Sequence, residues 1–171
     1  MRVNFIEPAL KEGHYCWLID LGGRLVGVHA QTGWCVRIDK RILALDAESN
    51  FVPLVPLLDA PEADFSAFLK KSAEATPALA RQILAFPKKT LLKHVFNTSY
   101  SGYWPERAIN WLAADEMLWP QFQKDLEAFS VNKVMPQTAR QRARRMLRAI
   151  ACYRDDLFPR PSLSQPVPLY G

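Results

Sequence analysis

The sequence lacks the features that mark most secreted and membrane-spanning proteins. It has only three cysteines, and none of them belongs to a C-x-x-C pair. This usage predicts reduced thiols in a cytoplasmic protein and argues against a secreted disulfide framework. No uncharged run approaches the ~20 apolar residues that a membrane-spanning helix needs. The N-terminus, MRVNFIEPALKEGHY, has no apolar stretch typical of a signal peptide, so we expect none.

Signatures of catalysis and metal binding are missing as well. Gly22-Gly23 predicts a turn, since no phosphate-binding G-x-x-x-x-G-K pattern surrounds it. The gaps between His14, Cys16, His29 and Cys35 match no closed zinc spacing. No serine or cysteine lies in a nucleophile elbow, although a Cys–His pair brought together by the fold stays open. We therefore expect no catalytic residue, no metal, no cofactor and no enzymatic activity.

Residues 1–58 have the pattern of short strands separated by turns. Three apolar runs follow one another here, at residues 15–19, 25–28 and 34–38. Glycine-containing turns join these runs, which predicts a three-stranded antiparallel meander. Residues 42–45 and 51–55 predict a further hairpin, whose second strand lies at an edge because it contains prolines.

Residues 59–157 carry apolar side chains at helical spacing, with prolines near the expected helix starts. We expect a first helix capped by Asp59 and later helices at residues 78–86, 90–96, 105–114, 115–129 and 136–157. Asp115 is the expected cap of the fifth of these helices. The prolines of residues 158–171 predict an extended tail. The sequence as a whole predicts one α+β domain, an N-terminal antiparallel β-meander packed on a C-terminal bundle of short helices.

The net charge of +5 comes entirely from the C-terminal end of the chain. Residues 1–132 contain 14 Lys/Arg and 15 Asp/Glu, whereas residues 133–171 contain 8 and 2. We therefore expect any partner that is attracted by positive charge to bind at the last helix.

Arginines dominate that helix. Arg140, Arg144 and Arg148 recur every four residues, which places them on one helix face. Three interpretations stay open: a solvated face beside acids such as Asp125 and Glu127, a protein-binding surface, or a surface for a phosphate backbone.

The stretch at residues 98–122 is rich in aromatic side chains. Trp104, Trp111 and Trp119 are spaced seven and eight apart, which predicts one helical face and core positions. Tyr100 and Tyr103 lie among Ser and Gly, the composition of protein-binding loops. For the two tyrosines, a core role and a binding role remain alternatives.

Two runs carry a resemblance to a known class of proteins. SYSGYWPERAINWL at residues 99–112 and NKVMPQTARQRARRMLR at residues 132–148 resemble small bacterial immunity proteins of toxin–immunity loci, including contact-dependent inhibition systems. The resemblance implies a cytoplasmic, non-catalytic protein that binds one cognate toxin domain and blocks its active site. No contact residue carries over, because each such pair has its own interface.

We therefore expect specific binding of a protein partner, with toxin neutralisation as its sharpest form and nucleic-acid binding by the arginine-rich helix as the alternative. Acidic side chains are included among the candidate contacts because a nuclease toxin has a basic cleft. The candidates are Tyr100, Tyr103, Trp104, Glu106, Asp115, Glu116, Arg140, Arg144 and Arg148.

Overall fold

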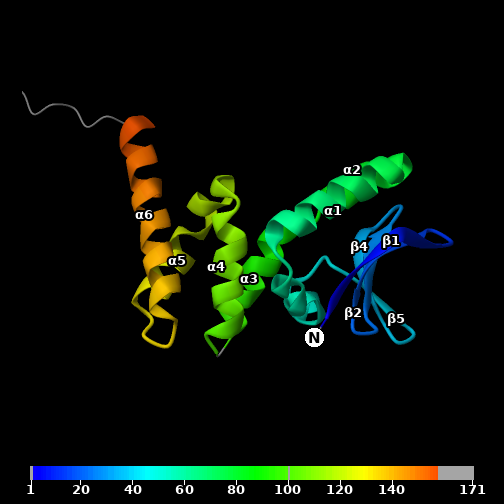
Figure 1. Cartoon of the computed structure of the whole chain (residues 1–171), viewed down its shortest axis with the longest axis horizontal. Coiled ribbons are helices and arrows are strands. Elements are labelled where there is room, and N and C mark those ends of the chain that lie inside the picture. Colours follow the sequence, from blue (N-terminus) through cyan, green and yellow to red (C-terminus); the bar gives the residue numbers. More distant parts are fainter. Residues whose placement is uncertain (1, 100, 158–171) are drawn as a thin grey trace, which may run out of the picture.

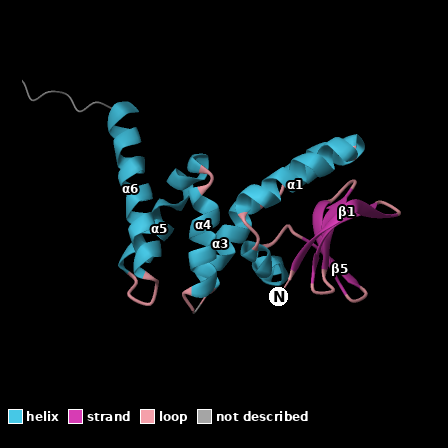
Figure 2. Cartoon of the chain, in the orientation of Figure 1, coloured by secondary structure: helices cyan, strands magenta, loops and turns pink. Residues whose placement is uncertain are grey.

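The chain has an α+β fold, as predicted, with an N-terminal antiparallel sheet followed by helices (Figures 1 and 2). The computed structural model describes residues 2–99 and 101–157, with side chains as far as Cys152. The expected tail at residues 158–171 and candidate Tyr100 lie outside this part. Within it, no helix is long and apolar enough to cross a membrane.

The sheet has five strands in simple sequential order. They are β1 Val3–Glu12, β2 Tyr15–Leu21, β3 Leu25–His29, β4 Gly33–Ile38 and β5 Arg41–Ala44. The predicted meander corresponds to β2, β3 and β4, and its turns use glycines at positive φ, including Gly22 and Gly23. The first strand was not predicted. Its register with β2 shifts between Phe5 and Leu10, so it lacks a regular alternation.

The strand predicted at residues 51–55 is wrong. These residues belong to the 3-10 helix η1, Glu48–Asp59. Phe51, Leu54, Leu57 and Leu58 are buried at intervals of three and four, which only a helical turn brings to one side. The two prolines of this segment also lack the N–H that a strand ladder needs.

Helices make up the rest of the described chain. They are α1 Glu62–Ala75, η2 Pro77–Leu79, α2 Ala80–Leu84, α3 Lys88–Thr98, α4 Tyr103–Ala113, η3 Glu116–Phe122, α5 Gln123–Val131 and α6 Gln137–Leu157. The helix expected at 115–129 is split, because Pro120 falls in the 3-10 part and α5 begins after it. The predicted cap Asp59 is wrong, because Pro61 precedes α1. Asp115 does occupy the N-cap position of η3, but its side chain makes no cap hydrogen bond.

One hydrophobic core joins the sheet to the helices. One face of the sheet contributes residues such as Val28 and Val36, while α6 contributes the predicted stripe of Ala139, Ala143, Met146 and Ile150. In Figure 1 the sheet lies at one end of the molecule and α6 at the other, with α3 and α4 between them. The helix surfaces that lie outside this core are the ones that a partner can contact.

Trp17 is fully buried on the face of the sheet that points away from that core. Its ring stacks on Tyr15 at 5.3 Å, the Arg37 guanidinium lies 4.8 Å from the ring centre, and its Nε1 donates to Glu12 Oε2 at 3.0 Å. Glu12 also pairs with Arg37, and these contacts hold the pKa of the Glu12 carboxyl below its usual range. The side chains of Tyr15, Arg37 and Glu12 therefore cover Trp17 on this outer face of the sheet.

Lys88, at the start of α3, ties three helical segments together. Its Nζ is 2.6 Å from Glu62 Oε1 in the first turn of α1 and 3.2 Å from Asp115 Oδ2 just before η3. Burial alone lowers the pKa of the Lys88 ammonium, but the hydrogen bonds and charges of the two carboxylates outweigh burial and raise it. Lys88 is therefore a charged link between the N-terminal and central helices.

Candidate protein-binding surface

The three tryptophans of the aromatic stretch have different surroundings. Trp111 is 1% exposed, stacks on Phe65 at 5.1 Å and donates from Nε1 to the Ala60 carbonyl at 2.8 Å. Trp119 is partly buried and donates to the Leu112 carbonyl at 2.8 Å. Their expected core roles are confirmed. Trp104 is partly buried at the start of α4, where it also borders a surface groove.

Tyr103, in contrast, is 48% exposed, yet its position is fixed on both sides. Its hydroxyl donates to Asp59 Oδ1 at 2.6 Å, and the Arg107 guanidinium lies 5.1 Å from its ring centre. Arg107 Nε is also 3.5 Å from Asp59 Oδ1. The Tyr103 side chain and the Asp59 carboxylate raise the pKa of the Arg107 guanidinium, which therefore stays charged. An aromatic ring held in this way loses little entropy on contact with a partner.

Sequence spacing explains why Tyr103 and Arg107 share a face with Trp111. The three residues are four apart on α4, so they point toward the same segment, the end of η1. Asp59 meets the first two, and the neighbouring Ala60 carbonyl meets Trp111.

A groove of about 600 Å³ adjoins this cluster on the Trp104 side. Its walls come from η1, α3 and α4 and are mostly apolar: Val52, Val55, Pro56, His94, Thr98, Ser99, Ser101 and Trp104. The Trp104 ring lies edge-on to Tyr103 at 4.8 Å, which joins the groove to the Tyr103 cluster. Apolar lining with a few hydroxyl groups at the rim is typical of a protein-binding surface. We call Val52, Tyr103, Trp104 and Arg107 the Tyr103 surface.

The acidic candidates do not form one free patch. Asp115 is engaged by Lys88 and so belongs to the helix link described above. Glu106 is partly buried on α4, and Glu116 is exposed on η3. Among the sequence candidates that the structure describes, Tyr103 and Trp104 are in direct contact with each other.

The arginines of α6 are positioned by neutral acceptors. Arg140 Nε donates to the Met135 carbonyl at 3.2 Å, Arg144 Nη2 donates to the Ser130 carbonyl at 3.0 Å, and Arg142 donates to Asn110 Oδ1. Arg148 is exposed. These contacts orient guanidinium groups without neutralising them.

No carboxylate of the described residues pairs with any of the α6 arginines whose side chains are described, which are those as far as Arg148. The acids expected beside the helix have other partners, since Lys93 binds Asp125 and Gln123 donates to Glu127 at 2.8 Å. Neither of these acids therefore pairs with the described arginines of α6, and Arg142, Arg144, Arg145 and Arg148 are exposed to solvent. A solvated face, a protein-binding surface and a phosphate-binding surface all stay open for this helix.

The cysteines and histidines do not form a reactive pair in the described part of the chain. His29 Nδ1 accepts hydrogen bonds from the backbone N–H groups of Gln31 and Thr32, both at 3.2 Å. Cys16 and Cys35 are buried, and burial raises the pKa of both thiols, that of Cys35 to about 11. Among the side chains that the structure describes, those of residues 2–99 and 101–152, no three of His, Cys, Asp or Glu are placed to share a metal ion.

This difference in burial predicts thiol reactivity. At pH 8 the aromatic disulfide DTNB is expected to modify the exposed Cys152 within minutes, while Cys16 and Cys35 react only on unfolding. A Cys35 thiol with a pKa of about 11 is only about one part in a thousand thiolate at that pH. Absorbance at 412 nm, with a Cys152→Ser control that removes the fast phase, measures this. Rapid release of all three equivalents from native protein contradicts the burial described here.

Comparison with known proteins found no match for this chain among family models, curated proteins or solved structures. Its function must therefore be argued from its own surfaces. Sequence reasoning had selected Tyr103 and Trp104 but missed Asp59, Arg107 and Val52. The sequence does show that Arg107 lies one helical turn after Tyr103 and so on the same helix face. It gives no indication of the contact with Asp59.

Proposed function

We propose that this chain is a non-catalytic protein that binds a specific protein partner through the Tyr103 surface. The observation that carries the proposal is an exposed tyrosine locked between Asp59 and Arg107 beside an apolar groove. Tyr, Trp and Arg are the residue types that most often dominate binding energy at interfaces. Val52, 61% exposed, extends the same surface with apolar area.

The most specific version of this proposal is that the chain neutralises a toxin domain. The resemblance at residues 99–112 and 132–148 supports it, and the first of these runs contains Tyr103, Trp104 and Arg107. Two buried, unpaired thiols support action in the cytoplasm, where cysteines stay reduced. In this role the protein would occupy the toxin and contribute no chemistry of its own.

Partner capture followed by mutation tests the proposal. Tagged protein is expected to retain one stoichiometric protein from a lysate of its host, in nuclease and in ~0.5 M salt, which screens exposed charges. With the purified partner, Tyr103→Ala is expected to weaken binding by about 30-fold, the effect of losing a hot-spot side chain. Leu84→Ser, which removes another exposed apolar side chain on α2, is the matched control. Unchanged affinity for Tyr103→Ala would reject the Tyr103 surface as the contact.

The toxin interpretation has its own readout. The captured partner, assayed alone, is expected to show a toxic activity that equimolar wild-type protein suppresses and Tyr103→Ala suppresses poorly. A partner without such activity leaves the chain as another kind of protein-binding module and excludes neutralisation.

A second function, binding of nucleic acid, rests on a different observation. The arginines of α6 are oriented by neutral oxygens and unpaired with carboxylates in the described part of the chain. Guanidinium groups with uncompensated charge suit phosphate contacts, which weaken steeply as salt rises. Captured material that is lost with nuclease or salt would favour this function over protein binding.

A further inference from the structure

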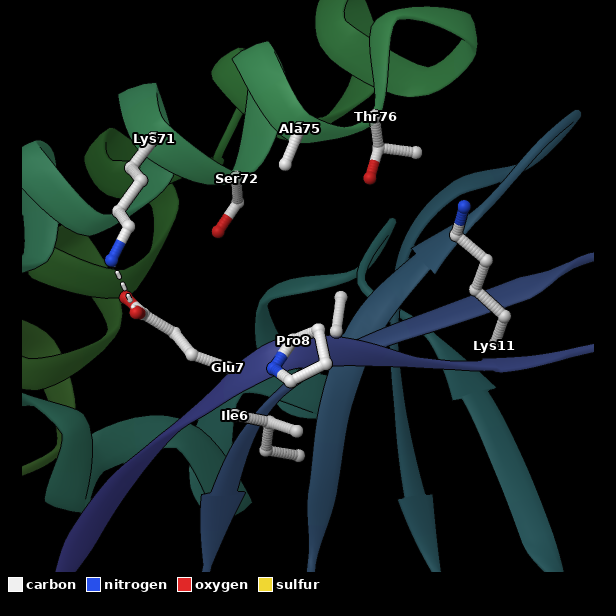
Figure 3. A pocket seen from close by; sticks show the side chains of 9 residues that line it. Ile6, Glu7, Pro8, Lys11, Lys71, Ser72, Ala75 and Thr76 are labelled. Carbon is white, nitrogen blue, oxygen red and sulfur yellow. Dashed lines mark hydrogen bonds and ion pairs between the residues drawn. The ribbon is translucent and has the colours of Figure 1, made fainter.

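A second groove, separate from the one beside Trp104, lies between β1 and α1 (Figure 3). β1 leaves its pairing with β2 between Phe5 and Leu10, and the released segment forms one wall. The opposite wall is the C-terminal half of α1. The groove has a volume of about 450 Å³, within the range of small-ligand sites.

Two hydroxyl groups in this groove have no hydrogen-bond partner among the described residues. Ser72, on α1, and Thr76, the residue that follows the end of α1, are each only 8% exposed and lie on the side that faces β1 (Figure 3). The hydroxyl of another buried residue, Ser130, is satisfied, because it donates to the Glu127 carbonyl.

Neither hydroxyl oxygen is itself fully buried: among the described residues, Trp34 Nε1 alone is a fully buried side-chain nitrogen or oxygen without a partner. The hydroxyls of Ser72 and Thr76 both point into the groove, where they are open to whatever fills it. A ligand with an acceptor group would satisfy them. The pair therefore offers two hydrogen-bond donors to a ligand that has an acceptor group.

The charges around the groove select the ligand. Lys71 pairs with Glu7 across one end, as the dashed line in Figure 3 shows, so those two charges cancel. Lys11 stands at the other end and has no ion pair with any described residue. The lining thus carries one uncompensated positive charge, which matches a monoanion and disfavours cations and dianions.

The walls between the two ends are apolar. Ile6, Pro8 and Ala9 line the β1 side, and Ala75 lines the α1 side. A ligand bound here needs an apolar body next to its charged group, since a fully polar anion would leave these side chains in contact with polar atoms.

We propose that the groove between β1 and α1 binds a small apolar monocarboxylic acid. The carboxylate accepts hydrogen bonds from the hydroxyls of Ser72 and Thr76 and is attracted by the Lys11 ammonium at the end of the groove, and the hydrocarbon chain lies against Pro8, Ala9 and Ala75. This site is separate from the Tyr103 surface and does not depend on the proposed partner.

Titration of the full chain with hexanoate, followed by ¹H–¹⁵N NMR, tests the site. Saturable shifts are expected in residues 6–12 and 71–76, with a dissociation constant of about 1 mM for so small a ligand. Hexanamide, the neutral analogue of the same length, is expected to bind about fivefold more weakly because it lacks the charge.

Variants separate the charge from the hydroxyls. Lys11→Met is expected to weaken hexanoate about fivefold and to leave hexanamide unchanged, while Ser72→Ala with Thr76→Val weakens both by about tenfold. Lys70→Met, an exposed lysine on the same helix outside the groove, is the matched control and is expected to change neither. The amide spectra of all variants report whether the fold is kept.

Three outcomes would overturn the proposal: no saturable shift at millimolar hexanoate, shifts centred elsewhere in the chain, or equal affinity in wild type and the hydroxyl variant. None of these bears on partner capture through the Tyr103 surface.

Discussion

Replacing Gly27 with alanine is expected to lower the free energy of unfolding by about 3 kcal/mol or more, and the variant is expected to be poorly folded at 37 °C. β2 has one residue more than β3 at this point, because Trp17 faces Gly27 while Ile19 faces Val26. The resulting bulge presses the β2 backbone against Gly27. A Cβ there would lie 2.2 Å from the Cys16 carbonyl oxygen and 2.8 Å from the Trp17 Cα.

The cost is high because both of these atoms belong to the backbone. A flexible side chain could rotate away, but here the bulge itself must shift, together with the buried Trp17. Urea unfolding followed by tryptophan fluorescence measures the loss.

Gly13→Ala is the matched control. Gly13 has a φ of +59°, but a Cβ added to it would meet no atom within 4 Å. Its substitution is therefore expected to cost only the about 1–2 kcal/mol of left-handed backbone strain. Equal unfolding midpoints for the two variants would show that crowding at Gly27 contributes nothing.

Replacing Lys88 with methionine is expected to cost about 3 kcal/mol at pH 7, since it leaves two carboxylates close together with no cation between them. Glu62 and Asp115 have side chains only 11% and 31% exposed, so water can screen them only in part. Methionine keeps the length and apolar stem of lysine, which isolates the effect of the charge. Chemical unfolding of both proteins across pH gives the difference.

The pH dependence follows from the raised pKa of Lys88 in the folded protein. A raised folded pKa means that the charged form stabilises the fold below the unfolded value near 10.5 and that this stabilisation is lost as pH rises through the folded pKa. Wild type is therefore expected to lose stability in strong alkali, whereas Lys88→Met lacks this loss.

Two further variants make the result specific. Lys89→Met removes the neighbouring lysine, which is not part of the ion link, and is expected to change stability by less than about 0.5 kcal/mol. Adding Glu62→Gln to Lys88→Met is expected to restore part of the loss. No restoration, or an equal loss in Lys89→Met, would argue against the ion link.

The turns and the helical stripes were predictable because their signals are local. Gly22-Gly23 and Gly33 occupy positive-φ positions that flank β3, and the apolar spacing of α6 matches the residues it buries. β1 escaped prediction because Pro8 and the bulge interrupt its alternation. The failure at residues 51–55 has another cause: β-branched and aromatic residues favoured a strand, while burial at three- and four-residue intervals stabilises η1.

The candidate site was predictable only in part, for a related reason. Tyr103 and Trp104 were identified by residue type, but the group that orients Tyr103 is Asp59, which is 44 positions earlier in the chain. Asp115 lies at the N-cap position of η3, as predicted, but its bond to Lys88, 27 positions away, was not predicted. Contacts at these separations depend on how helices pack, and a single sequence does not encode that packing in any short pattern.

The sequential order of the sheet affects how the chain is made. Each of β2, β3 and β4 pairs with the strands just before and after it in the sequence, so no pairing waits for a distant segment. During synthesis on the ribosome, the sheet can be completed hairpin by hairpin while the helices are still being translated. The emerging η1, α1 and α2 then find one apolar face already formed, which shortens the time that this face is exposed to aggregation.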